Sequence, residues 1–291
     1  MTAPELTLDE ADLRRLAESA LAEDRADRDV TTAALVPGDQ TGSAAIIAGA
    51  EGILAGLPVA RAVFLAVDTT LVWKPSLEDG HRLSPGDRVV TIEGSLASIL
   101  RAERVALNYL THLSGVATAT AAVVRALEGS GCRLRDTRKT IPGLRALEKY
   151  AVRLGGGTNH RLNLAEGVLI KDNHLAALLD RDLDIADAVR LARRANPGMT
   201  IEIEVTTVDE ARQALSAAAD ELLLDNMPPD QIREVVALAS GRDPRPLLEA
   251  SGGITLKNAH QIAETGVDFI SMGAITHSAQ ALDMSLQVEA N

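Results

Sequence analysis

Short apolar runs that alternate with helical patterns are the feature of this 291-residue chain that most restricts its fold. Such runs fit parallel strands buried on both faces, and repeated strand–helix units of about 20–35 residues imply a parallel barrel or a doubly wound sheet. Six strands are predicted, at Cys132–Arg135, Gly167–Ile170, Ile201–Val205, Glu221–Leu224, Leu247–Ala250 and Phe269–Met272. The helices predicted between them are Asp184–Ala195, Thr207–Ala217, Pro229–Ala239 and Leu256–Glu264.

The first half of the chain has a different pattern, in which short β-rich runs are punctuated by Gly and Pro. These runs are Gly42–Ala48, Leu71–Lys74 and Arg88–Glu93. A capping box at Thr7-Leu8-Asp9-Glu10 predicts the start of an N-terminal helix, and a second one at Thr207-Val208-Asp209-Glu210 predicts another. A long helical pattern extends from Ser95 toward Ala126, and we expect an interruption near Ser114-Gly115.

These two patterns predict two domains. Residues 1–116 are expected to form an N-terminal α+β sandwich, and residues 117–277 an incomplete, six- or seven-stranded α/β barrel, since a standard barrel has eight strands. Residues 282–289 alternate in polarity as a strand does. We therefore expect the C-terminal segment, about 278–291, to return to the N-terminal domain.

The charge of the chain is uneven, although its net value of −12 argues against a nucleic-acid surface. Between Arg133 and Lys171, nine basic residues stand against three acidic ones, a surplus of six that leaves −18 on the rest. A solvated helical face is the simplest interpretation of a basic run, and Lys149 and Arg153 fit it. The rest of the stretch predicts a local positive well in an acidic protein.

Polar residues and glycines gather where successive predicted strands end. They are Lys171-Asp172, Glu202 and Glu204, Asp225-Asn226, Ser251-Gly252-Gly253, and Gly273-Ala274. The carboxyl ends of the strands form the active-site face of an α/β barrel, and glycines after the last two strands are typical of a phosphate site there. Helix caps and tight turns also occur at such ends, but five of them in register favour a functional mouth.

Several other classes of site are disfavoured. The chain contains no dinucleotide fingerprint, no P-loop and no HExxH motif. Its one cysteine, Cys132, excludes an internal disulfide and a cysteine-only zinc cluster. No apolar run approaches the length of a membrane span, and the N-terminal residues do not resemble a signal peptide, so we expect a cytoplasmic protein.

Two basic blocks resemble the core of the quinolinate phosphoribosyltransferases, also called carboxylating nicotinate-nucleotide pyrophosphorylases. They are Arg135-Asp136-Thr137-Arg138-Lys139-Thr140-Ile141-Pro142-Gly143-Leu144-Arg145 and Gly155-Gly156-Gly157-Thr158-Asn159-His160-Arg161. Further matches are Glu103-Arg104, Ile170-Lys171-Asp172-Asn173-His174, Leu224-Asp225-Asn226 and Glu249-Ala250-Ser251-Gly252-Gly253-Ile254. The resemblance covers nearly the whole chain in order, with small departures at Asn163 and Ala250.

The resemblance implies the joining of quinolinate to phosphoribosyl pyrophosphate with loss of CO2, normally with Mg²⁺. By this resemblance, Arg138 and Arg161 bind the quinolinate carboxylates, and Lys139, His160 and Lys171 surround the same pocket. The family also implies an oligomer, at least a dimer, in which Arg104 of one subunit contributes to the site of its neighbour. Ser251, Gly252 and Gly273 match the ribose-phosphate site. Glu204 and Asp225 match the ribose-hydroxyl and magnesium side. Lys139, Lys171, Glu204 and Asp225 are the implied catalytic residues. Whether Tyr109 or His112 reaches the pocket is left open.

Two alternatives to this interpretation differ in what they require. A phosphoribosyltransferase acting on nicotinate would need fewer cationic groups than Arg138, Lys139, His160 and Arg161 provide. A non-catalytic relative that binds an anionic metabolite should lack part of the set formed by Lys171, Glu204 and Asp225, which is complete here.

Overall fold

The chain, represented by a computed structural model that describes residues 9–179 and 182–289, forms two compact units. The first contains the chain up to Ala121, Ile141–Gly156 and the chain from Ile275 on, and the second contains Ala122–Thr140 and Gly157–Ala274. The units are interleaved, because the chain re-enters the first one twice. The predicted boundary near residue 116 assumed that only the C-terminal segment returns to the first domain, whereas Ile141–Gly156 also belongs to the first unit.

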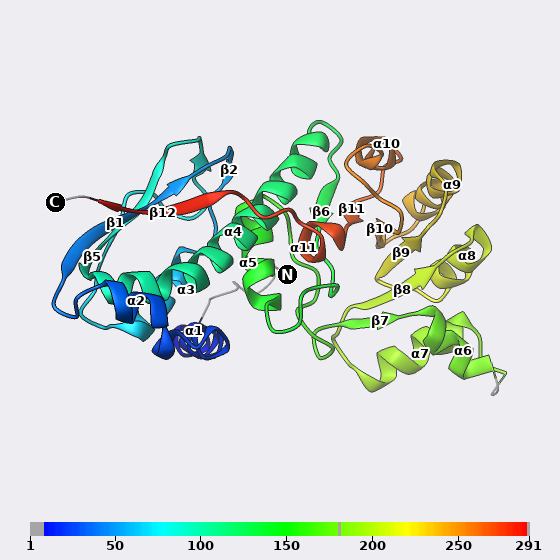
Figure 1. The fold of residues 1–291 in the computed structure, drawn as a ribbon. Helices are drawn as coiled ribbons and strands as arrows, with labels where there is room; N and C mark the ends of the chain where they lie inside the picture. Colours follow the sequence, from blue (N-terminus) through cyan, green and yellow to red (C-terminus); the bar gives the residue numbers. More distant parts are fainter. Residues whose placement is uncertain (1–8, 180–181, 290–291) are drawn as a thin grey trace. The chain divides into compact units, whose positions relative to one another are not determined.

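The first unit is built on a four-stranded antiparallel sheet in the order β12-β1-β5-β3 (Figure 1). Its strands are β1 (Thr41–Ala48), β3 (Val72–Pro75), β5 (Arg88–Ser95) and β12 (Met284–Glu289), with a separate antiparallel pair of β2 (Gly52–Ile53) and β4 (Arg82–Leu83). Its helices are α1 (Glu10–Asp24), η1 (Ala26–Arg28), α2 (Val30–Leu35), α3 (Leu57–Val67), α5 (Arg145–Leu154) and most of α4 (Leu96–Ala126). One apolar core joins the sheet to α1, α3 and α4. The α+β architecture predicted for this half is thereby confirmed.

Helix α4 is continuous from Leu96 to Ala126, so the interruption expected near Ser114-Gly115 was wrong. The hydroxyl of Ser114 accepts a hydrogen bond from the Ala55 amide at 3.0 Å and donates to the Ala55 carbonyl at 3.2 Å. A Cβ atom on Gly115 would lie 2.1 Å from the backbone carbonyl oxygen of Gln280. These two residues therefore allow other backbone segments to approach the helix closely, and they do not break it.

Two helix starts differ in detail from the capping boxes that were predicted. Helix α1 is capped by Asp9, whose carboxylate accepts from the Ala11 amide at 3.0 Å, while Thr7 and Leu8 lie outside the described residues. At α8 (Val208–Ser216), Thr207 accepts from the Glu210 amide at 3.2 Å as expected. The Glu210 carboxylate, however, accepts from the amide of Thr206 at 2.7 Å instead of completing the box.

The second unit is built on a six-stranded parallel sheet in the order β6-β11-β10-β9-β8-β7, and all six predicted strands are present. They are β6 (Arg133–Arg135), β7 (Val168–Ile170), β8 (Ile201–Val205), β9 (Glu221–Asp225), β10 (Leu247–Ser251) and β11 (Phe269–Ser271). The expected incomplete barrel takes the form of this sheet, which is not closed. Thr158 adds an isolated parallel bridge to Arg135 on the free edge of β6.

Helices connect these strands and pack beside one another along the sheet, as α7 does with α8 and α8 with α9 (Figure 1). They are α6 (Asp172–Leu179), α7 (Ile185–Ala195), α8, α9 (Pro229–Ser240) and α10 (Ala259–Ala263), and α11 (Ala274–His277) follows the last strand. Helix α10 is shorter than the Leu256–Glu264 pattern predicted, because Asn258 turns back to accept from the Thr255 amide at 2.7 Å. No helix within residues 9–179 and 182–289 has the length and apolar character needed to cross a bilayer.

Candidate functional site

The pairing register of the six-stranded sheet places the predicted site residues on one face. Leu223 pairs with Glu204 on one neighbouring strand and with Glu249 on the other. Side chains two positions apart on a strand share a face. Asp225 and Ser251, which pair with each other, therefore lie on the face of Glu204, at the carboxyl ends of their strands. We call this edge the mouth; it comprises Lys171, Glu204, Asp225, Ser251, Gly252 and Gly273.

Lys171 and Glu204 form an ion pair at the ends of β7 and β8. The Glu204 side chain is 10% exposed, whereas that of Lys171 is 43% exposed, so the ammonium group faces solvent at the mouth. The backbone amide of Lys171 also donates to Nδ1 of His174 at 2.9 Å, and the Lys171 carbonyl accepts from the His174 amide at 2.8 Å. This reciprocal contact fixes the backbone where β7 passes into α6.

The turn after β10 packs closely against the turn after β9. The Asn226 amide donates to the Ser251 carbonyl at 2.8 Å, and the Asn226 side chain donates to the Asp225 carboxylate at 2.7 Å. Gly252 has a φ of +84°, and a Cβ there would lie 2.3 Å from Oδ1 of Asn226. Glycine is therefore required both for the backbone conformation and for the contact. The packing of the two turns explains Gly252, and the phosphate site predicted at this strand end stays a prediction.

Arg161 carries a partly buried guanidinium group that is affected by the charge of Arg138. Burial lowers the pKa of Arg161, and the positive charge of Arg138 lowers it further. Arg161 donates from Nη1 to the Gly167 carbonyl at 3.1 Å, while its buried Nε has no hydrogen-bond partner among the described residues. Two positive charges that repel each other, together with a buried donor of Arg161 that has no partner among the described residues, are suited to an anion.

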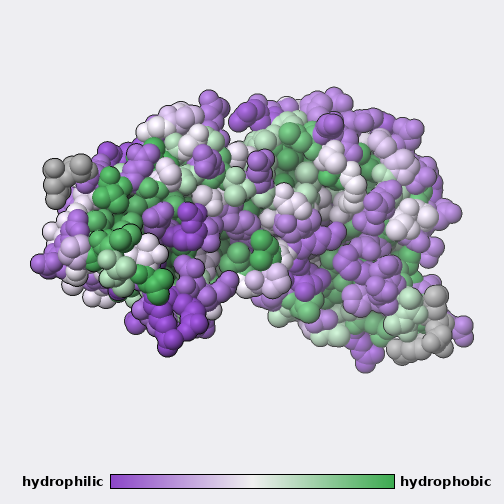
Figure 2. All heavy atoms as spheres, in the orientation of Figure 1, coloured by the Kyte–Doolittle hydropathy of each residue, from purple (hydrophilic) through white to green (hydrophobic). Residues whose placement is uncertain are grey.

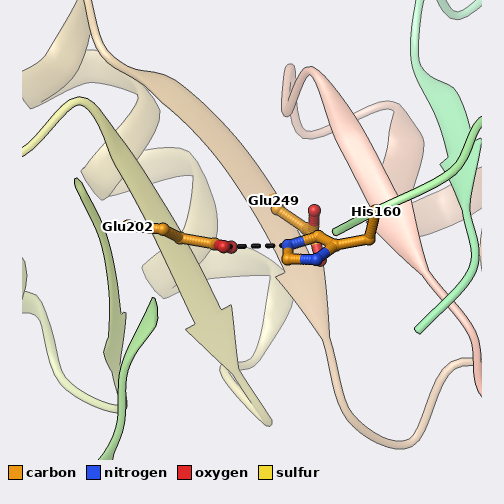
Figure 3. Close-up of side chains that lie close together, drawn as sticks. All are labelled: His160, Glu202 and Glu249. Atoms are coloured by element: carbon orange, nitrogen blue, oxygen red, sulfur yellow. Dashed lines mark hydrogen bonds and ion pairs between the residues drawn. The ribbon is translucent and has the colours of Figure 1, made fainter. Parts of the chain in front are cut away.

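His160 lies beside Arg161 on the segment that bridges to β6. The buried carboxylate of Asp136 accepts from the His160 amide at 2.9 Å and from the Asn159 side chain at 2.6 Å. Across the interior, His160 Nε2 lies 2.8 Å from a carboxylate oxygen of Glu202 on β8 (Figure 3). Burial lowers the pKa of His160, but the hydrogen bond to Glu202 and its charge together raise it above the ordinary value.

Beneath the mouth lies a buried ionic cluster that the sequence did not reveal. Arg135 forms ion pairs with Glu221 and, at 2.7 Å, with Glu249, and its guanidinium lies 3.4 Å from the ring centroid of Phe269. Burial and the charge of Glu202 raise the pKa of Glu249, and they raise that of Glu221 to about 7. The sequence offered one indication of this cluster. Glu221 and Glu249 are acidic residues within apolar strand runs, and charged residues at such positions are rarely buried unless they are paired.

Two carboxylate groupings could in principle hold a metal ion. Ligand atoms of His160, Glu202 and Glu249 lie within 4.8 Å of one another, but His160 already bonds to Glu202, and Glu249 to Arg135. At the mouth, Glu204 and Asp225 offer oxygen atoms from the same face of adjacent strands. Oxygen ligands suit Mg²⁺, so the mouth pair fits that ion better than the buried trio does.

The first unit carries one predicted site residue, Arg104, on α4. Its side chain is 65% exposed, and it lines a hollow together with Arg101 and α2 residue Val30. Tyr109 and His112, whose place was left open, line a different pocket within the same unit. His112 contacts Glu148 at 2.8 Å, and Tyr109 donates to the Leu16 carbonyl at 3.2 Å.

Lys149, predicted to be solvated, is buried on α5, with 1% of its surface exposed. The neighbouring Arg153 is exposed as expected. The helix explains the difference, because Leu147, Ala151 and Val152 are also buried and leave Lys149 on a covered side. The basic stretch therefore does not form a solvated helical face at this position.

The chain matches two family models along most of its length. Residues 29–114 match the quinolinate phosphoribosyl transferase N-terminal domain, and residues 116–287 match the C-terminal domain. Two curated relatives are the nicotinate-nucleotide pyrophosphorylase [carboxylating] of Mycobacterium leprae and a probable one from Bacillus subtilis. The first is 43% identical over 89% of this chain and 91% of its own, and the second is 41% identical over 95% and 93%.

A solved structure is similar over its whole length. The nicotinate-nucleotide pyrophosphorylase from Francisella tularensis superposes with a TM-score of 0.91 at 39% identity, covering 99% of this chain and 100% of that one. Sequence identity and fold therefore point to the same family.

Proposed function

The chain belongs to the quinolinate phosphoribosyltransferase family, and from that premise we propose which of its residues perform the family's reaction. The enzyme transfers a phosphoribosyl group from phosphoribosyl pyrophosphate to quinolinate, with decarboxylation, and yields nicotinate mononucleotide, pyrophosphate and CO2 for NAD biosynthesis. The observation that carries our assignment of residues is the buried Nε of Arg161, which has no hydrogen-bond partner among the described residues and belongs to a guanidinium whose pKa is lowered by burial and by the charge of Arg138.

Arg138 and Arg161 bind the carboxylates of quinolinate. A planar guanidinium can donate two parallel hydrogen bonds to a carboxylate, and a dianion relieves the repulsion between the two arginines. The buried Nε of Arg161 supplies one donor for this purpose. Lys139 belongs to the same basic segment and completes the proposed pocket, and His160 lies next to Arg161 at its border.

The mouth binds phosphoribosyl pyrophosphate. Ser251, Gly252 and Gly273 hold the ribose phosphate, since their backbone amides lie where strands of the sheet end. Glu204 and Asp225 bind the ribose hydroxyl groups and hold Mg²⁺, directly or through water. When bound, Mg²⁺ neutralises charge on the pyrophosphate and so makes it a better leaving group.

Positioning and electrostatics supply most of the catalysis in this mechanism. The pyridine nitrogen attacks the anomeric carbon as the bond to pyrophosphate breaks, and Lys139 and Lys171 stabilise the negative charge that develops. Bond formation leaves the ring nitrogen positively charged. The adjacent carboxylate then departs as CO2, its bonding electrons remain on the ring carbon, and that carbon takes up a proton.

A second subunit contributes Arg104 to this site in the proposed assembly, which is at least a homodimer. The exposure of Arg104 supports a role outside its own unit. The neighbouring helix α2 exposes Val30 and Leu35 by 79% and 75%, and Figure 2 shows hydrophobic atoms over this helix beside the hydrophilic surface of α1. Exposed apolar surface of this kind is typical of subunit contacts. We also propose that the enzyme acts in the cytoplasm.

An assay of quinolinate, phosphoribosyl pyrophosphate and Mg²⁺ tests the assignment through Arg138→Ala. Loss of a charge-assisted contact should lower kcat/KM for quinolinate about 10- to 150-fold, and Lys171→Ala should act similarly. Arg153→Ala removes an exposed arginine from α5 and serves as the matched control. Folded Arg138→Ala enzyme with wild-type kcat/KM would contradict the site. Label released as CO2 from the carboxylate beside the ring nitrogen separates this reaction from transfer to nicotinate.

A further inference from the structure

Both ring nitrogens of His160 are already engaged by the protein. Nε2 lies 2.8 Å from Oε2 of Glu202, and Nδ1 accepts a hydrogen bond from the backbone amide of Arg161 at 2.9 Å. A ring held on both sides has no nitrogen left to donate to a substrate carboxylate in this geometry. His160 therefore has a different task from that of the arginine beside it.

The contact with Arg161 identifies the form of the ring. A backbone N–H can only donate, so Nδ1 must carry a lone pair, and the proton of the neutral ring must reside on Nε2. That proton points to Glu202, which accepts it. The charged groups around the ring are Glu202 on β8, Glu249 on β10, Arg135 on β6 and Asp136, which binds the His160 amide.

We propose that Glu202 and His160 form a positioning pair for Arg161: Glu202 holds His160 as the Nε2–H tautomer, and Nδ1 then fixes the Arg161 backbone. The pair would determine affinity for the quinolinate carboxylate without touching it. This inference rests on the proposed function, in which Arg161 binds that carboxylate.

The Glu202–His160 contact can position Arg161 because it joins two distant parts of the second unit. His160 follows the segment bridged to the free edge of β6, whereas Glu202 lies in β8, next to the opposite edge strand. Figure 3 shows the His160 ring next to the Glu249 side chain, in front of the strand that carries it, with one ring nitrogen turned toward Glu202. A rigid strand thereby orients a loop residue, and small errors in the orientation of a binding group cost catalysis heavily.

Asp136 and Glu202 act on different atoms, so their effects can be separated. Asp136 accepts from the His160 amide and from Asn159, and it holds the chain before Arg161. The one hydrogen bond of the Glu202 side chain among the described residues is to the His160 ring, and its other oxygen, Oε1, is buried with no hydrogen-bond partner among them. Glu202→Gln keeps an acceptor for Nε2–H, whereas Glu202→Met removes it at similar volume.

The first test is the tautomer of the neutral ring in the wild-type enzyme, measured by NMR of ¹⁵N-labelled histidine at alkaline pH, because Glu202 raises the pKa of His160 and favours the imidazolium at lower pH. The His160 signals are assigned by their loss in His160→Asn. A protonated Nε2 with an unprotonated Nδ1 is expected. An imidazolium, or a proton on Nδ1, would overturn the proposal whether or not any variant folds.

The second test is kinetic. Glu202→Met should raise KM for quinolinate at least about tenfold, as expected for loss of one charge-assisted hydrogen bond, and leave KM for phosphoribosyl pyrophosphate within about threefold. Glu202→Gln should restore most of the affinity. Glu221→Met is the matched control. Glu221 is buried, as Glu202 is, and it is the residue of β9 that pairs with Glu202 in the sheet, but its described hydrogen bond is to Arg135 and not to His160. Equal quinolinate KM values in folded Glu202→Met and wild type would overturn the proposal.

A variant pair at the histidine covers the case in which Glu202→Met does not fold. The side-chain oxygen of His160→Asn can still accept from the Arg161 amide, whereas His160→Leu cannot. A lower quinolinate KM in the asparagine variant supports the proposal, and equal values contradict it. Failure of the wild type to convert quinolinate would instead count against the proposed function, and the tautomer result would be unaffected.

Discussion

At the scale of single residues, the sequence indicated the side chains at the mouth more readily than those beneath it. Lys171, Asp225 and Ser251 end apolar strands and stand in recognisable motifs. Glu221 and Glu249 are single acids in apolar runs, and the sequence alone does not say that Arg135, far away in the chain, pairs with both. Such pairs depend on sheet order, which strand patterns do not specify.

The buried cluster makes stability depend on pH through Glu221. Burial and nearby carboxylates raise the pKa of Glu221 to about 7, so the folded state keeps a proton that the unfolded chain releases near the ordinary value of 4.5. Binding of this proton stabilises the folded state fully below pH 4.5, and the stabilisation is lost as the pH rises toward 7. Glu221→Gln mimics the protonated form permanently.

We therefore expect Glu221→Gln to unfold at a higher urea concentration than wild type at pH 8, and at a similar concentration at pH 5. The difference at pH 8 should be on the order of 3 kcal/mol at most, since one unit of pKa corresponds to about 1.4 kcal/mol. Glu78→Gln, which changes a carboxylate with no contact to the cluster, is the control. A wild type more stable than Glu221→Gln at pH 8 would show that Glu221 is ionised and favourably paired.

At the scale of elements, local sequence predicted strand and helix positions well and their interruptions poorly. All six strands of the second unit lie where apolar runs placed them, and β8, β9, β10 and β11 contain consecutive buried residues, as expected for strands covered on both faces. The error at Ser114-Gly115 arose because a glycine in a helical pattern can mean either a break or a close approach. Only the position of Gln280, remote in sequence, distinguishes the two cases.

Gly115→Ala tests that explanation. Alanine favours a helix by about 1 kcal/mol over glycine, but a Cβ placed 2.1 Å from a backbone oxygen must displace the chain at Gln280. Overpacking of this kind costs about 1–3 kcal/mol or more, so we expect a lower Tm by several degrees. Gly241→Ala is the control, since its nearest neighbour would lie 4.0 Å away. An unchanged or higher Tm for Gly115→Ala would show that the contact yields easily.

At the scale of the whole molecule, the sequence indicated a two-part architecture but not how the chain divides between the parts. The segment Ile141–Gly156 belongs to the first unit, although it lies within the basic stretch whose flanks belong to the second. Contacts such as that between Tyr150 and Asp79, at 2.8 Å, assign it there. Long-range contacts of this kind leave no local pattern in the sequence.

Ten of the eleven proposed substrate-binding residues belong to the second unit, and Arg104 alone belongs to the first. If Arg104 serves the site of a neighbouring subunit, then Arg104→Ala and Lys171→Ala chains should complement one another. A mixed dimer would contain one site with both residues and one with neither. Random association of equal amounts should therefore restore about one quarter of wild-type activity, because half of the dimers are mixed.

The complementation is measured on co-expressed chains carrying two different affinity tags, purified in succession so that only mixed dimers remain. The tandem-purified dimer should then show about half of wild-type activity, one working site in two. Arg104→Ala paired with the double variant Arg104→Ala/Lys171→Ala is the control, since it contains no Arg104 and should stay inactive. Inactive mixed dimers of the two single variants would mean that each Arg104 acts within its own subunit. In that case the exposed arginine on α4 and the exposed apolar side chains of α2 would need separate explanations.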